Sequence, residues 1–274
     1  SPTGPLHLGH AFSALTAWSR AQAAGGAFLL RIEDIDQTRA RAHWETGIYE
    51  DLQWLGLTWE TPVVRQSTRM EAYRTALECL WDQGLLYVCT CTRKDIEAAL
   101  SAPQEGIPLL GPDGLIYPGT CRGTPRTGAL PKGTALRLDS ALALKHLNDL
   151  SFEETGPAFL GRHGIDPARF VAEVGDIVLA RKEFGTSYHL SVVLDDAAQG
   201  ITHVTRGEDL FEATQIHVVL QALLGLPTPI YQHHPLVRDE HGKRLAKRDD
   251  ARALSTFRAN GFTPDDIKEM SGLA

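Results

Sequence analysis

Apolar and polar positions along this chain follow the spacing of helices that alternate with short strands. The segment AFSALTAWSRAQAA predicts a helix over residues 10–24, which the following Gly25 and Gly26 end. The apolar run AFLLRI, residues 27–32, predicts a strand directly after that helix. Because a helix that joins two parallel strands forms a crossover, we expect another strand ahead of Ser1. The start of the chain therefore predicts a parallel sheet covered by helices.

The same alternation continues after this unit and gives the predicted fold class, α/β. Two more helices are expected over residues 41–55 and 68–83, and Gly84 ends the second. Later segments predict strands over residues 176–180 and 201–206 and helices over residues 188–198 and 211–224.

Residues 86–139 interrupt the alternation. A short strand LLYVC and a helix that begins near Thr92 are followed by a run rich in Gly and Pro over residues 103–133. We interpret the interruption as an insertion into one α/β domain. The predicted organisation is a first half over residues 1–85, the insertion over 86–139, a second half over 140–235, and a basic loop with a short helical tail over 236–274.

The composition fits one large folded domain with an insertion. The 274 residues are 43% hydrophobic and 22% charged, which supports a sizeable core and excludes disordered architectures. No stretch approaches the about 18 apolar residues of a membrane span, and no export signal opens the chain, so we expect a cytoplasmic protein with no membrane partner, and a monomer by default. A net charge of −7 argues against non-specific coating of nucleic acid but allows a local basic face.

Two segments carry candidate phosphate chemistry. SPTGPLHLGH places His7, Gly9 and His10 directly before a helix, whose N-terminal N–H groups and dipole suit phosphate. A capped helix without further function is the alternative. The second segment is the basic loop RLAKR, Arg244 to Arg248, whose charges can stabilise a developing pyrophosphate. Its alternative is a solvated surface turn.

Together these two loops are the signatures of class I aminoacyl-tRNA synthetases, and the chain resembles the glutamyl-tRNA synthetase family among them. The resemblance implies a Rossmann-like parallel-sheet catalytic domain with an insertion and a short helical C-terminal segment. It also implies ATP-dependent formation of glutamyl-adenylate. The matching segments, in family order, are SPTGPLHLGH, RIEDID at 31–36, YHLSVVLDD at 188–196, GITHVTRGED at 200–209 and KRLAKR at 243–248.

The resemblance assigns roles to individual residues. Glu33 is expected to hold the α-ammonium group of glutamate, and Arg206 its side-chain carboxylate, which Arg can bind bidentately. In isolation each could instead form an ordinary salt bridge. Ser1 and Tyr188 are assigned to the same pocket. The residues assigned to ATP, which enters with Mg²⁺, are His7, Gly9, His10, Glu208, Arg244 and Lys247, and those assigned to catalysis are His7, His10 and Lys247.

The basic loop departs from the family pattern. Arg244 stands where the family has a lysine, and Ala246 where it has a serine, although Lys243 is adjacent and Lys247 is kept. A guanidinium keeps the positive charge without the compact geometry of an ammonium group.

Three of the four cysteines fall in the predicted insertion. Their clustering favours metal over disulfide in a reducing compartment, with reduced, packed cysteines as the alternative. The resemblance implies a structural zinc held by Cys89, Cys91, Tyr117 and Cys121, in which Tyr is an uncommon ligand. Cys79, on an apolar helix face, is predicted to lie in the core.

Within the family the chain resembles the glutamyl-queuosine tRNA(Asp) synthetases, which lack the helical anticodon-reading domain. This resemblance implies that the acceptor is queuosine in the anticodon stem-loop of tRNA(Asp). A catalytic fragment of a glutamyl-tRNA synthetase acting on tRNA(Glu), and a non-catalytic paralogue that binds glutamate and ATP, are the alternatives. The candidate basic residues for docking the tRNA are Arg122, Arg126 and Lys132.

Overall fold

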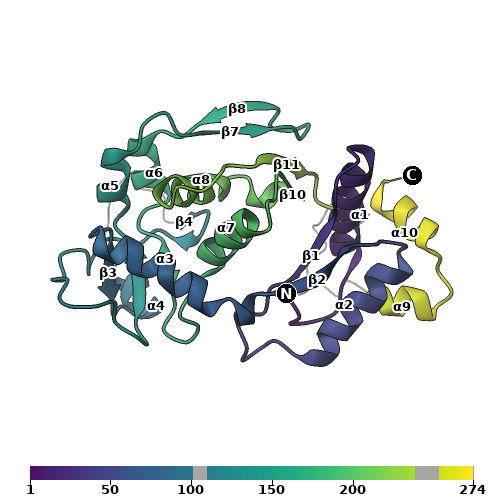
Figure 1. Ribbon diagram of the computed structural model, residues 1–274, viewed down its shortest axis with the longest axis horizontal. Coiled ribbons are helices and arrows are strands. Elements are labelled where there is room, and N and C mark those ends of the chain that lie inside the picture. Colours follow the sequence, from purple (N-terminus) through teal and green to yellow (C-terminus); the bar gives the residue numbers. More distant parts are fainter. Residues whose placement is uncertain (101–109, 238–252, 274) are drawn as a thin grey trace.

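A computed structural model describes residues 1–100, 110–237 and 253–273 of the chain. Figure 1 shows two groups of elements side by side: α1 and α2 lie in one group with the two C-terminal helices, and α3, α7 and α8 lie in the other. Strands and helices alternate through both groups, so the predicted α/β class is confirmed. Within the described residues, no helix is long and apolar enough to cross a membrane.

The end of the chain packs on its beginning. The elements of this first group are α1 (Leu8–Ala23), β1 (Leu29–Ile32), α2 (Ala42–Trp54), β2 (Glu60–Arg65), α9 (Leu254–Ala259) and α10 (Pro264–Ser271). Leu254, Phe257 and Ile267 of the two C-terminal helices lie in one buried cluster with Leu8 and Leu15 of α1. The predicted helical tail is therefore confirmed, and it closes the core beneath the N-terminal loop.

The second group contains a mixed sheet with two helices beside it. Its strands run in the order β10 (His203–Gly207), β11 (Ile230–His234), β7 (Ser151–Glu154) and β8 (Gly161–Gly164), and the helices are α7 (Tyr188–Ala198) and α8 (Thr214–Leu223). β10, β11 and β7 pair in parallel, whereas β7 and β8 form an antiparallel hairpin. In the β10–β11 register Arg206 stands opposite His233. This hairpin is not among the elements predicted from the sequence.

A separate antiparallel sheet joins the predicted insertion to the second half of the chain. Its strands are β3 (Leu86–Cys89), β6 (Ala135–Leu138) and β9 (Val178–Ala180), packed against α3 (Met70–Asp82). The strand expected over residues 176–180 is thus present, but it pairs with β6 of the inserted segment. The remaining elements here are α4 (Arg93–Leu100), β4 (Leu110–Gly111), β5 (Gly114–Leu115), α5 (Ser140–Ala143) and α6 (Pro167–Glu173).

The predicted continuous parallel sheet is found in two parts. One is the β1–β2 pair and the other contains β10, β11 and β7; within the described residues no strand pairs with both β1 and β10. Neighbouring strands of a sheet must lie about 4.8 Å apart to share hydrogen bonds.

The ends of α1 and α3 agree closely with the sequence pattern, but the burial predicted for Cys79 on α3 is wrong. Gly25 and Gly84 follow α1 and α3 with φ of 63° and 80°, the left-handed conformation that glycine adopts without strain. Cys79 is exposed, contrary to the prediction that it lies in the core. The buried face of α3 contains Leu77 and Leu80, and a residue between them on a helix of 3.6 residues per turn faces another direction.

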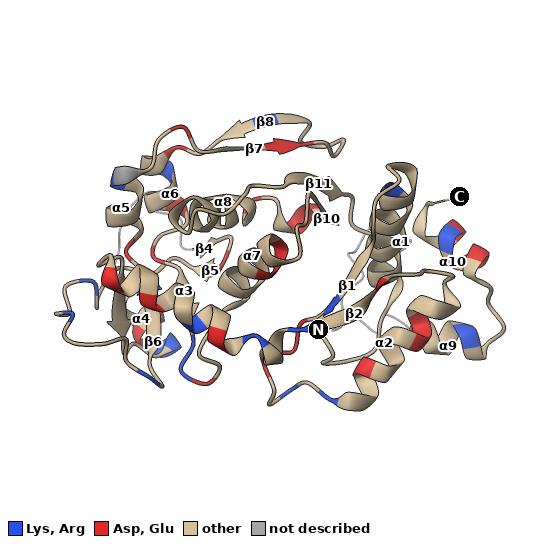
Figure 2. Cartoon of the chain, viewed as in Figure 1, with Lys and Arg blue, Asp and Glu red and all other residues tan. Residues whose placement is uncertain are grey.

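A buried carboxylate on α7 connects three segments of the chain. Asp195 is fully buried and accepts hydrogen bonds from Gln66 at 3.0 Å and Tyr73 at 2.8 Å, and it also pairs with Arg69. Arg31 of β1 lies 4.0 Å away. Figure 2 shows acidic residues on α7 and one basic residue, Arg31, within β1. Asp195 therefore holds α7 against α3 and β1.

Replacing this carboxylate is expected to destabilise the fold. In Asp195→Ala the Arg69 and Tyr73 donors lose their acceptor inside the protein, so the free energy of unfolding should fall by about 3–5 kcal/mol. Urea denaturation followed by circular dichroism measures the change. Asp265→Ala is the matched control, because Asp265 is exposed on α10 and its one ion pair among the described residues is with Lys268, so a loss of less than about 0.5 kcal/mol is expected. Equal losses in both variants would contradict the role of Asp195.

Candidate functional site

The His-x-Gly-His segment caps α1. His7 is the N-cap residue, its Nδ1 accepts from the Gly9 N–H at 3.1 Å, and Nδ1 of His10 accepts from the His7 N–H at 3.1 Å. The capped helix considered from the sequence is therefore present. Because each Nδ1 is an acceptor, a neutral ring carries its proton on Nε2, where it can serve as a hydrogen-bond donor.

Gly9 is needed for this arrangement. A Cβ atom at Gly9 would lie 3.1 Å from Cε1 of the His7 ring, closer than side chains normally approach. The side chain that packs against Gly9 is thus the imidazole ring of His7. The two imidazole centroids lie 3.8 Å apart. The segment places two rings side by side at the positive end of a helix dipole, an arrangement that suits an anion.

Both flanks of the predicted basic loop lie beside α1. Ala253, which follows the loop, forms an isolated β-bridge with His7. His234, which precedes it at the end of β11, shares a 2.6 Å hydrogen bond between its Nε2 and the Oγ of Ser13 on α1. The residues of the loop that were assigned to ATP and catalysis, Arg244 and Lys247, fall outside the described residues.

Glu33 lies just beyond β1 and its side chain is 30% exposed. Nη2 of Arg31 lies 3.5 Å from a Glu33 oxygen but only 2.9 Å from an oxygen of Asp196. Arg31 also donates to Gln199 at 2.9 Å. The salt bridge considered for Glu33 therefore exists, but the guanidinium is engaged more closely elsewhere. The carboxylate of Glu33 keeps an exposed part that can accept from an ammonium group.

Arg206 lies on β10 with a half-buried guanidinium. Nε donates to His233 Nε2 at 3.1 Å, Nη1 to His217 Nδ1 at 3.0 Å, and Nη2 to Thr214 Oγ1 at 2.7 Å and the Leu210 carbonyl at 3.3 Å. Of its five N–H donors, four have protein acceptors and one on Nη1 is left. Among the described residues, no carboxylate lies within 4.0 Å of this cation. The arrangement favours an anionic ligand.

Tyr188 begins α7 and lies within electrostatic reach of both Glu33 and Arg206. The residue is 36% exposed, but partial desolvation raises the pKa of its hydroxyl to about 12, with Glu33 raising and Arg206 lowering that pKa. Glu33 and Arg206 also act in opposite directions on the pKa of Asp196, which burial raises. The structure thus brings together an acid, a phenol and a cation that are far apart in sequence.

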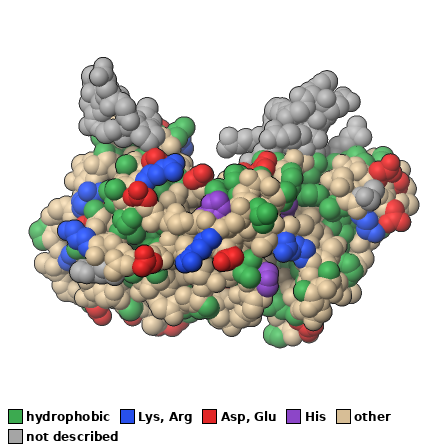
Figure 3. All heavy atoms as spheres, turned by 90° about the horizontal axis from the view of Figure 1, so that it is seen from above, with side chains coloured by type: hydrophobic (Ala, Val, Ile, Leu, Met, Phe, Trp, Pro, Cys, Tyr) green, Lys and Arg blue, Asp and Glu red, His purple; other side chains and the backbone are tan. Residues whose placement is uncertain are grey.

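Two further predicted site residues, Ser1 and Glu208, lie among the described residues. Ser1 is exposed and its carbonyl accepts from the Thr3 N–H at 2.9 Å. Glu208 begins a 3₁₀ turn that follows β10 directly, two residues after Arg206. On the face seen in Figure 3, histidine, acidic and basic side chains lie along the middle of the molecule.

Three histidines near Arg206 were missed by the sequence analysis. His189, His217 and His233 are all buried. Burial and the charge of Arg206 lower the pKa of His217 well below its usual value. Burial also lowers the pKa of His233, against the opposing effect of Glu154. Single histidines in helices and strands carry no motif, so only their proximity in the fold identifies them.

The insertion brings three thiols together. The Sγ atoms of Cys89, Cys91 and Cys121 all lie within 4.8 Å of one another, and those of Cys91 and Cys121 are 3.5 Å apart. Tyr117 is buried beside them, with its hydroxyl 3.3 Å from the Cys91 sulfur. Arg137 lies over the Tyr117 ring, 3.9 Å from its centroid. All four predicted metal ligands therefore lie in one small cluster, and the cysteines are free thiols.

The protons of this cluster are held unequally. Burial raises the pKa of the Cys91 thiol. Burial acts the same way on Cys121, but hydrogen bonds from Tyr117, Thr90 and Cys91 outweigh it and lower its pKa to about 6. A thiol with a lowered pKa is readily deprotonated, as metal binding requires.

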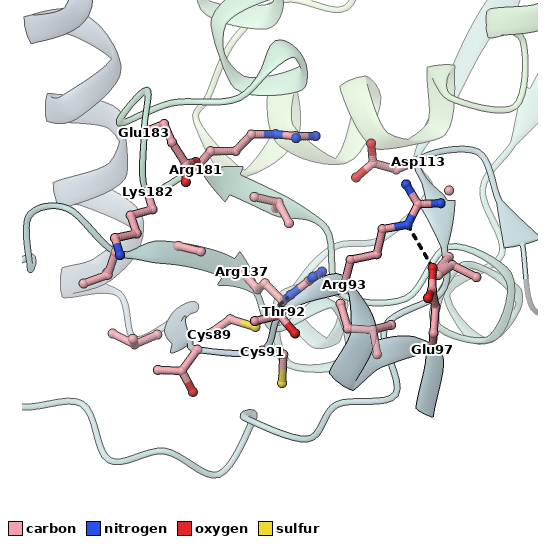
Figure 4. Close-up of a pocket in the computed structure, with 18 of the residues that line it drawn as sticks. Cys89, Cys91, Thr92, Arg93, Glu97, Asp113, Arg137, Arg181, Lys182 and Glu183 are labelled. Carbon is pink, nitrogen blue, oxygen red and sulfur yellow. Dashed lines mark hydrogen bonds and ion pairs between the residues drawn. The ribbon is translucent and has the colours of Figure 1, made fainter. Parts of the chain in front are cut away.

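A pocket of about 990 Å³ lies beside the cluster (Figure 4). Cys89 and Arg137 lie on one side of it and Arg181 and Asp113 on another.

Of the basic residues suggested for tRNA docking, Arg122 is paired with the buried carboxylate of Asp176 at 2.8 Å, so it contributes less to a free basic surface than expected.

Comparisons with known proteins agree with this geometry. Residues 1–106 and 166–271 match the family of class I tRNA synthetases for glutamate and glutamine (E and Q), catalytic domain. A glutamyl-Q tRNA(Asp) synthetase of Rhodobacter capsulatus is 65% identical over the whole chain, which covers 98% of that relative. One from Albidiferax ferrireducens is 43% identical over 93% of this chain and 85% of its own length.

Solved structures share the fold. A glutamate tRNA ligase from Elizabethkingia meningosepticum, in complex with its amino acid, has a TM-score of 0.72 and 24% identity. The match covers 98% of this chain but only 58% of that ligase. The fold is therefore that of a class I synthetase catalytic domain. The chain belongs to the class I tRNA synthetases for glutamate and glutamine, within which its relatives are glutamyl-Q tRNA(Asp) synthetases, and it is a ligase.

Proposed function

We propose that this ligase forms glutamyl-adenylate from ATP and L-glutamate and transfers the glutamyl group to queuosine in the anticodon stem-loop of tRNA(Asp). The observation that carries the proposal is the Arg206 guanidinium, a half-buried cation without a described carboxylate partner, in electrostatic reach of the same tyrosine as Glu33. A dicarboxylic amino acid has charges that match this pair. The extent of the match to the Rhodobacter capsulatus relative favours this acceptor over tRNA(Glu).

In the proposed pocket Glu33 accepts from the α-ammonium group and Arg206 attracts the distal carboxylate. Because four of its N–H groups already donate to the protein, Arg206 would contact that carboxylate through the remaining Nη1 hydrogen and its charge. The bidentate contact expected from the sequence would require one of these bonds to break. Tyr188 would form one wall, with Ser1 at the rim.

The proposed ATP site lies at the start of α1. The Nε2–H groups of His7 and His10 and the N-terminus of the helix would face phosphate oxygens, with Gly9 giving the rings room and Glu208 framing the nucleotide. Magnesium would accompany the triphosphate. The glutamate α-carboxylate attacks the α-phosphorus in line and pyrophosphate leaves, a step that requires positioning and charge more than a protein nucleophile. Arg244 and Lys247 are proposed for the pyrophosphate from the sequence alone.

We also propose that Cys89, Cys91, Cys121 and Tyr117 hold a structural zinc ion. Sulfurs at about 2.3 Å from a tetrahedral zinc lie about 3.8 Å from one another, and the observed separations extend from 3.5 Å to within 4.8 Å. Four protein ligands leave no open position, so the ion would supply stability and no chemistry of the reaction. The buried cluster around it is small, with Tyr87, Cys89 and Tyr117 at its centre, and a metal would compensate for that.

The reaction can be tested with pyrophosphate exchange and with transfer of labelled glutamate. We expect exchange that depends on glutamate and needs no tRNA. This result would favour the queuosine-directed enzyme, because discriminating full-length members of the wider family generally require tRNA for this step. Label should reach tRNA(Asp) that carries queuosine and be absent from tRNA(Asp) without it. Transfer to tRNA(Glu) would instead indicate a glutamyl-tRNA synthetase fragment, and absence of exchange in every condition would refute glutamate activation.

The zinc site can be tested by metal analysis. The purified protein should contain about one zinc per chain, and Cys91→Ser and Cys121→Ser should reduce that content and lower the melting temperature because the site loses a thiolate. Cys79→Ser is the matched control, since Cys79 is exposed and remote from the cluster. Full zinc content in Cys121→Ser would rule out Cys121 as a ligand, and Tyr117→Phe tests the fourth position in the same way.

A further inference from the structure

The hydrogen bonds around Arg206 form two chains, and each ends at a carboxylate. In the first, Nε of Arg206 donates to Nε2 of His233 at 3.1 Å. A nitrogen that accepts cannot carry the proton, so the His233 proton is on Nδ1, which faces the buried carboxylate of Glu154. Glu154 also accepts from the His233 backbone N–H at 3.0 Å. Glu154 thereby fixes the tautomer that His233 presents to Arg206.

The second chain runs from Arg206 toward the inserted segment. Nη1 of Arg206 donates to Nδ1 of His217 at 3.0 Å, which places the His217 proton on Nε2. That nitrogen faces Nδ1 of His189 at 3.0 Å, so the His189 proton is on Nε2 in turn. His189 Nε2 lies 3.2 Å from an oxygen of Asp113. Each N–H group in this chain donates to the next residue along it, and the chain ends at the Asp113 carboxylate.

These chains hold the guanidinium without neutralising it. Both imidazoles that touch Arg206 are neutral in the required tautomers, and the third partner is the hydroxyl of Thr214 at 2.7 Å. The carboxylates of Glu154 and Asp113 are each separated from Arg206 by at least one ring. Contacts in three directions fix the rotamer of a side chain that is otherwise rich in conformations.

We infer that His217 and His233, oriented by Asp113 through His189 and by Glu154, are positioning residues that fix Arg206 and so set the length of amino acid the pocket accepts. The inference rests on the proposed function, because it deepens the role given to Arg206 there. With Glu33 on one side and Arg206 held in place on the other, a ligand shorter by one methylene is expected to leave its carboxylate short of the Nη1–H. Glutamine reaches it but brings no charge.

The titration of the histidines supports this role. Burial and Arg206 lower the pKa of His217, and burial lowers that of His233. At His217 the facing groups are Arg206, His189 and His233, which all oppose protonation. At His233 they are Arg206 and His234, which oppose protonation, and Glu154, which favours it. Both rings are therefore neutral at and above neutral pH. As the pH falls, an imidazolium can no longer accept from Arg206 and repels it, so the KM for glutamate should rise on the acid side.

Substitutions that keep or remove one acceptor test the inference. The amide oxygen of Asn can take the place of Nδ1, and that of Gln the place of Nε2, so His217→Asn and His233→Gln should keep a KM for glutamate near that of the wild type. His217→Ala and His233→Ala should raise it about ten- to hundredfold and reduce the preference for glutamate over aspartate. The KM for ATP should not change. Pyrophosphate exchange gives all these values, and melting temperatures report any loss of folding.

A variant at the far end of the second chain avoids the buried core. Asp113 has a side chain that is 32% exposed and does not touch Arg206. Asp113→Ala should raise the KM for glutamate about fivefold, because His189 loses the acceptor that sets its tautomer. Glu97→Ala is the matched control. Glu97, like Asp113, lines the cavity beside the cysteine cluster, and its one ion pair among the described residues is with Arg93, so no change is expected.

The outcomes separate the inference from the proposed function. If wild-type protein shows no exchange with glutamate, the proposed function fails and the inference with it. If wild type exchanges and Arg206→Gln raises the KM for glutamate, but the two alanine variants at His217 and His233 leave KM and the preference over aspartate unchanged, the function stands and the inference is wrong. Asn at 217 behaving as badly as Ala, with an unchanged melting temperature, would also overturn it.

Discussion

The candidate site depends on one positive charge that the described protein surrounds with neutral acceptors. A buried guanidinium is costly unless its N–H groups are satisfied, and Arg206 meets that requirement with two imidazoles, a hydroxyl and a carbonyl. A carboxylate in any of these positions would have satisfied the charge as well. The β10–β11 register sets His233 opposite Arg206, and α8 contributes Thr214 and His217. The described residues thus supply hydrogen-bond acceptors to the guanidinium but no carboxylate, so its positive charge is left for a ligand.

At the negative end of the pocket, the cation beside Glu33 is paired with other residues of the protein. Among the described residues, Arg31 is the cation that pairs with Glu33. The Arg31 guanidinium lies closer to Asp196 than to Glu33, and it also donates to Gln199. Asp195, the neighbour of Asp196, is buried among donors from α3. The acidic end of α7 therefore takes up most of the positive charge of β1, and Glu33 remains available to an ammonium group. Separation of charge across the pocket is a consequence of where α7 ends.

The sequence predicted the parts of the fold that depend on local periodicity. Helices α1, α2, α3 and α7 follow from apolar spacing and terminal glycines, and the segments with motifs located Glu33, Arg206 and the thiols. Pairing between distant segments could not be predicted: β9 pairs with β6, and the β7–β8 hairpin is joined by a loop, residues 155–160, whose Gly156-Pro157 marks a turn without specifying which strands pair. His189, His217 and His233 were missed for the same reason, because each is an ordinary core histidine until tertiary contacts align their nitrogens.

The inserted segment and the pocket are connected through the backbone as well as through side chains. β3, which ends at Cys89, lies in one antiparallel sheet with β6 and β9, and the chain from β9 leads within a few residues to Tyr188 and His189 at the start of α7. The hydrogen bond from His189 to Asp113 joins the same two regions a second time. Leu86 of β3 and Leu138 of β6 lie in the large core cluster together with Leu190 of α7. The strand that ends at Cys89 and the helix that begins at Tyr188 are therefore packed in one core, although the cysteine cluster and the surroundings of Arg206 share no residue.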